Sequence, residues 1–191
     1  MASAERGEGL RRLVHILTSF FIFYYWIPDF IFDVHKEYLL VMFLAVVLLI
    51  DSYRMHVGWK VYGAREYEHN RPSALALVAI GVTVGLLFFP KHLVIPSILT
   101  MAFVDPVIRA VRDREGLIYP VLPLCMAVSI FYGALYYLTD WSGVYVIGLA
   151  VVAGSMAIAV ERPHIEWLDD DLLIILVPMT VLWILSILLN I

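Results

Sequence analysis

The chain lacks the residues and motifs on which several common kinds of active site depend. Cys125 is its only cysteine, so neither an intrachain disulfide nor a cysteine metal cluster can form. It has no Walker A loop, no dinucleotide-binding glycine run and no G-x-S-x-G elbow, and the soluble nucleotide-binding folds are therefore excluded as far as motifs can exclude them. It also has no basic tract with interleaved aromatic residues, so nucleic acid is not an expected partner.

Charged residues are scarce as well. They make up 16% of the 191 residues, whereas hydrophobic residues make up 62% and the mean hydropathy is +0.88. A soluble domain is not this apolar, so we expect lipid to cover most of the surface of one integral membrane domain, residues 1–191. The first apolar run follows a basic stretch, as a signal peptide does. It is long and aromatic and has no small-residue cleavage pattern, so we interpret it as a retained span.

Seven apolar segments follow one another along the chain, most of them near the roughly 17–25 residues that a bilayer crossing needs. Backbone polar groups inside a bilayer must find partners within the protein, which favours helices. The sequence therefore predicts an all-α fold, a polytopic bundle of about seven transmembrane helices. The expected segments are 13–34, 36–53, 73–90, 92–112, 117–138, 143–160 and 171–191.

The basic residues predict how this bundle lies in the cell membrane. If the N-terminus is cytoplasmic, eleven of the thirteen fall inside and two fall outside. This is the distribution that the positive-inside rule describes. The N-terminal segment 1–12 and the loop 52–72 are then cytoplasmic, and the C-terminus is outside. The inner set is Arg6, Arg11, Arg12, Arg54, Lys60, Arg65, Arg71, Arg109, Arg112, Arg114 and Arg162, and the outer set is Lys36 and Lys91.

The ionisable residues nearest the bilayer lie at the cytoplasmic ends of their segments. An ionisable side chain at membrane depth is costly and usually marks a functional site, so this polar layer predicts chemistry at one face of the membrane. No ionisable residue lies at a span centre, where a proton or ion path would require one, which disfavours a channel or transporter. The residues of the layer are His15, Asp51, Asp105, Glu161 and Asp169 to Asp171.

The carboxylates of this layer suggest a magnesium site. Asp105, Glu161 and the run Asp169 to Asp171 offer hard oxygen ligands, and Mg²⁺ typically binds one or two carboxylates together with substrate phosphates. Two simpler interpretations stay open. Asp105 and Arg109 are four residues apart on one helical face and can form an internal ion pair. Acidic residues at a helix N-terminus also stabilise the helix dipole.

Arg11, Arg12 and His15 enter the first span together as the string RRLVH. Arginine can bind phosphate in a bidentate manner, and histidine can orient or protonate a transferring group, so these residues form a candidate anion clamp. The alternative is a positive-inside anchor with a buried histidine bonded to a neighbour.

Four stretches resemble the polyprenol kinase family of membrane proteins, which includes dolichol and phytol kinases. They are RRLVH, REYE at 65–68, LFFPKHLVIPSILTMAFVDP and VERPHIEWLDDD. Their order is retained over nearly the whole chain, and the second and third look most similar to the archaeal branch. The resemblance implies transfer of a phosphoryl group from CTP to the hydroxyl of a polyisoprenoid alcohol at the cytoplasmic face, with a divalent cation such as Mg²⁺.

The resemblance also implies roles for individual residues. Asp105, His15 and Glu161 are expected catalytic residues, and Asp105, Asp169 and Asp170 are expected metal ligands. Arg11 and Arg12 are expected to contact the nucleotide phosphates. Arg109 and Arg112 are candidates for the same role on a different ground, because the basic residue that usually follows the fourth span in this family is absent. Asp171 stands where the family usually has asparagine, so we expect it to matter less than Asp105.

The sequence departs from the family pattern around Asp105. Val104 precedes this aspartate where a glycine is usual, and Arg109 and Arg112 follow where small residues are usual. The usual Ser/Thr-x-Glu-Gly-Ser stretch has no counterpart in residues 116–124. Two alternatives therefore stay open beside the kinase. One is a CTP-dependent cytidylyltransferase that acts on a lipid phosphate, and the other is a catalytically inactive protein of the kinase fold that binds lipid or serves in assembly.

Overall fold

The computed structural model describes residues 9, 12–59, 71–112, 118–161 and 169–191, and these residues are almost entirely helical. Residues 12–18 are α-helical and continue into a 3-10 helix, η1; we refer to residues 12–26 as the first helix. The expected all-α class is confirmed, with one addition: a two-stranded hairpin of four residues. The elements are η1 (Ser19–Trp26), β1 (Phe30–Ile31), β2 (Val34–His35), α2 (Lys36–Val57), α3 (Ala74–Phe88), α4 (Lys91–Val111), α5 (Ile118–Leu138), α6 (Gly143–Ala159) and α7 (Asp170–Leu189).

Four of these helices are long and apolar enough to cross a membrane. They are α2, α4, α5 and α7, with 20–22 residues each. At about 1.5 Å per residue, such a helix is about 30 Å long, which matches the hydrocarbon thickness of a bilayer. The helices α3 and α6 are apolar but shorter, with 15 and 17 residues.

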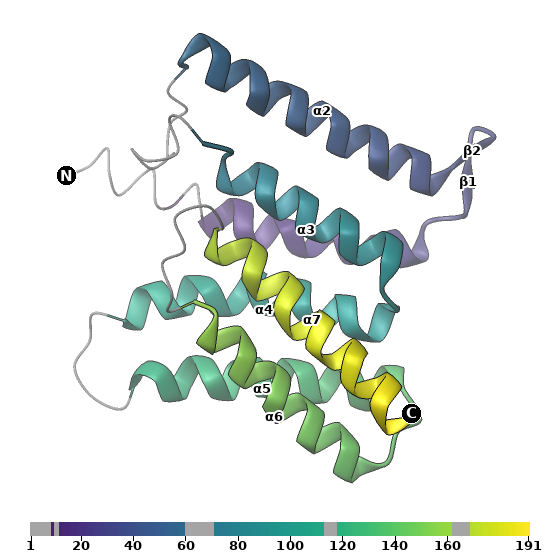
Figure 1. Ribbon diagram of the computed structural model, residues 1–191, viewed down its shortest axis with the longest axis vertical. Coiled ribbons are helices and arrows are strands. Elements are labelled where there is room, and N and C mark those ends of the chain that lie inside the picture. The colour runs from purple at the N-terminus through teal and green to yellow at the C-terminus, as the bar shows by residue number, and fades with distance from the viewer. Residues whose placement is uncertain (1–8, 10–11, 60–70, 113–117, 162–168) are drawn as a thin grey trace.

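Consecutive helices run in opposite directions, so their ends gather at two poles (Figure 1). At one pole α2, α4 and α6 finish and the first helix, α3, α5 and α7 begin. We call this pole the charged end, because it holds Asp51, Arg54, Asp105, Arg109 and Glu161. The opposite pole carries the hairpin, and we call it the hairpin end.

Helix α4 is the most enclosed of the four long helices. In its most apolar stretch 67% of the residues are buried, against 17% in α2. It packs against the first helix, α3, α5 and α7, whereas α2 lies at the edge of the bundle against α3 (Figure 1). A polar residue on α4 is therefore surrounded by other helices.

Two predicted boundaries are wrong. The first predicted segment extends to residue 34, but the first helix ends at Trp26 because Pro28 follows and the chain turns into the hairpin. Phe32 and Asp33 have φ values of 51° and 63°, the left-handed conformation of a tight two-residue turn. The second predicted segment ends at residue 53, but α2 continues to Val57 and ends at Gly58, whose φ of 69° forms a left-handed cap.

A buried polar contact explains why α2 extends past the apolar run. Arg54 Nε donates to Asp51 Oδ1 at 2.8 Å within the last turns of α2. The backbone N–H of Ser73 donates to Asp51 Oδ2 at 3.0 Å, and Arg54 Nη2 donates to the carbonyl of Arg71 at 2.6 Å. These bonds tie the end of α2 to the residues that begin α3, so Asp51 has a structural role.

Small residues allow two close helix contacts. A Cβ atom at Gly154 in α6 would lie 2.9 Å from the backbone nitrogen of Val128 in α5. A Cβ atom at Gly81 in α3 would lie 2.9 Å from Leu172 Cδ1 in α7. Gly148, by contrast, has open space around it. Small residues are a common means of bringing helices together inside membranes.

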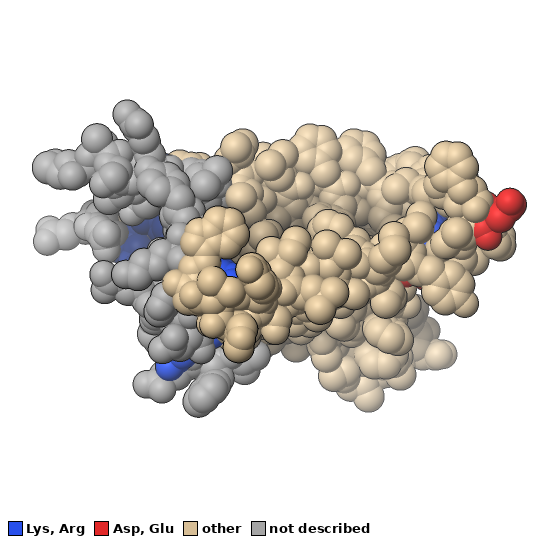
Figure 2. All heavy atoms as spheres, turned by 90° about the horizontal axis from the view of Figure 1, so that it is seen from above, with Lys and Arg blue, Asp and Glu red and all other residues tan. Residues whose placement is uncertain are grey.

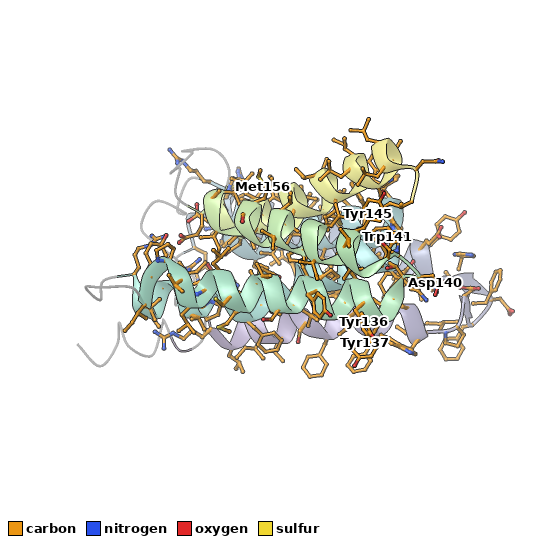
Figure 3. All side chains as sticks on the ribbon, turned by 90° about the horizontal axis from the view of Figure 1, so that it is seen from below. Tyr136, Tyr137, Asp140, Trp141, Tyr145 and Met156 are labelled. Carbon is orange, nitrogen blue, oxygen red and sulfur yellow. The ribbon has the colours of Figure 1, made fainter. Side chains whose placement is uncertain are left out.

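The surface agrees with a membrane location. On the face shown in Figure 2 the middle of the molecule carries uncharged residues, and the coloured charged side chains lie toward the two poles. Figure 3 shows Tyr136, Tyr137, Trp141 and Tyr145 near the hairpin end, where α5 finishes and α6 begins. Tyrosine and tryptophan prefer the boundary between lipid and water, and the position of these rings fits such a boundary.

Candidate functional site

Three helices that are far apart in the sequence bring His15, Asp105 and Asp171 together near the charged end. They come from the first helix, α4 and α7. Each offers a ligand atom, and the three atoms lie within 4.8 Å of one another. His15 Nε2 is 3.8 Å from Asp105 Oδ2 and 3.6 Å from Asp171 Oδ2. We call these three residues the His-Asp-Asp cluster.

The cluster is closed off from solvent. The exposed fractions are 5% for His15, 1% for Asp105 and 0% for Asp171. On the other side of its ring, His15 Nδ1 lies 3.2 Å from the sulfur of Met101, one turn before Asp105 in α4. Two carboxylates in such surroundings are expensive to keep charged unless cations or hydrogen-bond donors neutralise them.

Arg109 supplies a positive charge to both carboxylates. Its Nε lies 3.1 Å from Asp105 Oδ1 and 2.9 Å from Asp105 Oδ2, and its Nη2 lies 3.0 Å from Asp171 Oδ1. The guanidinium therefore bridges α4 and α7. The internal ion pair between Asp105 and Arg109, which their four-residue spacing suggested, is present, and it extends to Asp171.

The C-terminal aspartates differ from the expected ligand set. Asp169 and Asp170 were the expected metal ligands, but the structure brings Asp171 to Asp105 and His15. Asp169 is the N-cap of α7 and Asp170 its first residue, and both are half-buried. Because 3.6 residues make one turn, Asp171 shares the buried face of α7 with Ile174, Ile175 and Pro178.

Glu161 belongs to a second polar group on the same side of α4. It forms an ion pair with Arg112 and accepts a hydrogen bond from Tyr119 Oη at 3.4 Å. Arg112 lies seven residues after Asp105, two helical turns or about 10 Å farther along α4. Glu161 is therefore paired with Arg112, and nothing in the sequence pointed to Tyr119.

The arginines of the expected phosphate-binding set have different positions. Arg109 lies in the last turn of α4 and Arg112 is the C-cap of that helix, and each forms an ion pair with a carboxylate. Arg12 is the first residue of the first helix, one turn before His15, and its side chain is exposed. Arg11 lies outside the described residues, as do the REYE stretch at 65–68 and residues 162–168 of the last resembling stretch.

The donor set of the His-Asp-Asp cluster suits a divalent cation. Two carboxylates and one imidazole can each offer a lone pair, and oxygen ligands are those that Mg²⁺ prefers. The guanidinium of Arg109 already stands as a cation between the two carboxylates. His15 Nε2 lies 3.8 Å from Asp105 Oδ2 and 3.6 Å from Asp171 Oδ2, and an imidazole can exchange a proton with a group close to it.

Comparisons of the chain with family models, with curated proteins and with solved structures return no match.

Proposed function

We propose that this chain is a kinase of the cell membrane that transfers a phosphoryl group from CTP to the hydroxyl of a polyisoprenoid alcohol at the cytoplasmic face. The observation that carries the proposal is the meeting of His15, Asp105 and Asp171 within 4.8 Å. Each of these residues belongs to a different one of the stretches that resemble polyprenol kinases, and they are separated by 90 and 66 residues in the sequence (105 − 15 and 171 − 105). Three such stretches converging on one buried point is what a shared active site requires.

The position of the cluster suits a lipid substrate and a nucleotide. An isoprenoid alcohol diffuses in the lipid layer beside the apolar helices, and its hydroxyl reaches the charged end. The nucleotide arrives from water at the same pole, where the described ends of the helices carry Arg12 and Arg112, both exposed. Phosphoryl transfer depends mainly on positioning and on neutralising charge, which these residues can supply.

The proposed reaction has a simple balance. The alcohol oxygen bonds to the γ-phosphorus, the bond from that phosphorus to the β-phosphate oxygen breaks, and CDP leaves. The alcohol proton passes to His15 Nε2 or to a carboxylate of Asp105, which lie 3.8 Å apart. Asp105 and Asp171 would hold Mg²⁺, whose contribution when bound is to neutralise phosphate charge. Arg109 and Arg112 would bind phosphate oxygens through their planar guanidinium groups.

The direct test is incubation of the purified protein in detergent with CTP, Mg²⁺ and a panel of isoprenoid alcohols. We expect CDP and an isoprenyl phosphate as products. Asp105→Asn keeps the shape of the side chain but loses the charge, and the rate should fall by about 10²–10⁴. Asp140→Asn is the matched control, because Asp140 is an exposed aspartate near the hairpin end (Figure 3). Normal turnover by Asp105→Asn would reduce Asp105 to a structural partner of Arg109.

The position of Asp171 changes the expectation for that residue. Its burial and its bond to Arg109 match those of Asp105, so Asp171→Asn should lower the rate about as much. The family resemblance alone favours a smaller effect. The ratio of the two mutant rates therefore separates the geometric argument from the sequence argument.

Two alternatives differ in what they do with CTP. A cytidylyltransferase acting on a lipid phosphate would release pyrophosphate in place of CDP. A catalytically inactive protein of the same fold would serve to bind lipid or to assemble with other proteins. The contacts of Arg109 with both carboxylates favour this last alternative, because they neutralise the pair without any ligand. Failure of the protein to bind CTP at all would select it.

We also propose the full seven-span topology, with the N-terminus in the cytoplasm and the C-terminus outside. Four candidate spans, the alternating helix directions and the distribution of basic residues support it. Single cysteines at Ser3 and Asn190, introduced after Cys125→Ser, can be labelled from either side of sealed vesicles. Labelling of both positions from the same side would rule out an odd number of spans.

A further inference from the structure

Arg109 already contacts both carboxylates that a divalent cation would need. Its Nε is 2.9 Å from Asp105 Oδ2, and its Nη2 is 3.0 Å from Asp171 Oδ1. Asp105 Oδ2 also faces His15 in the cluster. A Mg²⁺ ion binds oxygen at about 2.0–2.1 Å, so a cation bound to this oxygen would lie close to the guanidinium. Two positive groups cannot share such a space without strong repulsion. Binding of the metal therefore requires Arg109 to leave.

Arg109 cannot leave at no cost. Its side chain is only 24% exposed, so a guanidinium that loses both carboxylates needs another anion nearby. The reverse is also true. If a phosphate bound Arg109 and no metal ion were present, the two buried carboxylates would lose the guanidinium that neutralises them. Each ligand alone breaks a charge balance that the two ligands together restore.

We propose that Arg109 is an exchangeable internal cation, which neutralises Asp105 and Asp171 until a divalent cation takes its place and a phosphate-bearing ligand receives its guanidinium. The metal and the phosphate ligand then each strengthen the binding of the other. The inference rests on the proposed function in one respect, since it takes the phosphate ligand to be a nucleotide. It does not depend on turnover.

The position of Arg109 permits the exchange. It lies in the last turn of α4, one turn before Arg112, whose side chain is 45% exposed at the charged end. The partly exposed guanidinium therefore lies between the buried cluster and the pole where a phosphate can arrive. A guanidinium binds phosphate and carboxylate with the same two-pronged geometry, so the new contact can replace the old one.

The first measurement uses Mn²⁺ alone as the probe, with the full chain in detergent and no nucleotide. Binding is followed by the electron paramagnetic resonance signal of free Mn²⁺. We expect Arg109→Gln, which removes the internal cation, to bind Mn²⁺ at least tenfold more tightly than the unaltered protein. Arg112→Gln removes the same charge one turn farther along, at the C-cap of α4 beside Glu161, and should change the affinity by less than threefold. Equal affinity of the unaltered protein and Arg109→Gln, or an equal gain in both variants, would overturn the inference.

Arg109→Lys guards against a folding failure of Arg109→Gln, with size-exclusion elution as the check. Lysine keeps the charge, but its single ammonium cannot reproduce the two-pronged contact with both carboxylates. The Mn²⁺ affinity should therefore rise by a smaller factor, about threefold. An unchanged affinity in a folded Arg109→Lys protein, where Arg109→Gln cannot be made, counts against the inference.

The second measurement is equilibrium dialysis of CTP and of inorganic pyrophosphate, each with EDTA or with Mn²⁺. In the unaltered protein we expect Mn²⁺ to tighten binding at least tenfold, and Arg109→Gln to lose most of this coupling. Coupling with pyrophosphate but no binding of CTP would keep the inference and remove the proposed function. Kinase activity without any coupling would keep the proposed function and overturn the inference.

Discussion

Replacement of Gly154 by alanine tests the packing of α5 against α6. The added Cβ atom would lie 2.7 Å from Val128 Cγ2, 2.9 Å from Val128 N and 3.1 Å from Val128 Cα. The side chain of Val128 can rotate, but its backbone nitrogen and Cα move only with the helix. Since carbon atoms pack at about 3.5–4.0 Å, the two helices must separate by several tenths of an ångström. We therefore expect Gly154→Ala to destabilise the protein.

The expected magnitude comes from two opposing effects. Overpacking of a tight contact typically costs about 1–3 kcal/mol. Alanine is favoured over glycine inside a helix by about 1 kcal/mol, which offsets part of this cost. Gly148→Ala, in the same helix, gains the propensity without the clash, because nothing lies within 4 Å of its added Cβ. The free energies of unfolding of the two variants should therefore differ by about 1–3 kcal/mol, and this difference isolates the steric effect.

The assay is unfolding in mixed micelles of dodecyl maltoside and sodium dodecyl sulfate, followed by far-ultraviolet circular dichroism. Gly81→Ala should fall between the other two variants. Its Cβ would meet Leu172 Cδ1 at 2.9 Å, and the end of a leucine side chain can shift. Equal stability of Gly154→Ala and Gly148→Ala would refute the reasoning, because the close approach of α5 and α6 would then be absent.

Three further substitutions test other contacts. Asp51→Asn should lower the free energy of unfolding by about 1–3 kcal/mol, because it removes the charge of the carboxylate that accepts from the buried Arg54. Glu37→Gln, at an exposed position in the same helix, should change the free energy of unfolding little. The hydrogen bond and charge of Lys36 hold the pKa of Asp29 below its usual range. The stabilising contribution of Asp29 is therefore present above about pH 4 and is lost as pH falls through the lowered pKa. Asp29→Asn should remove this small part of the dependence of the free energy of unfolding on acid pH, as measured by unfolding at a series of pH values. In an active preparation Arg109→Lys should raise the KM for CTP or lower the rate, whereas Arg114→Lys should be nearly silent; wild-type kinetics for both would contradict a role of Arg109 in binding phosphate.

Part of the candidate site could be predicted from local spacing. Asp105 and Arg109 are four residues apart, and in any helix this spacing places them on one face, so their ion pair follows from the sequence. His15 and Asp105 could be singled out because an ionisable side chain at membrane depth is costly and usually marks a functional site. Their contact with each other could not be predicted, because it depends on how the first helix packs against α4.

Asp171 and Glu161 show where local reasoning stops. The helix α7 is apolar on every side, so its sequence contains no polar stripe from which to tell which of three consecutive aspartates faces the bundle. Packing against α4 decides in favour of Asp171. Glu161 was expected beside Asp105, but the ends of α4, α5 and α6 meet so that it lies with Arg112 and Tyr119.

The sequence by itself determined where the helices lie and which of their ends carries the charges. Apolar runs bounded by charged residues and proline predicted 92–112 and 117–138, and the structure has α4 from Lys91 to Val111 and α5 from Ile118 to Leu138. Hydrophobicity is a property of each side chain, and a run of apolar side chains in a bilayer must be helical. The boundaries of these helices can therefore be predicted from the local sequence. Only the tertiary structure decided which charges meet, because helices that are apolar all round can pack on several faces. Close contacts such as that of Gly154 with Val128 select one packing, and that packing brings His15, Asp105 and Asp171 together.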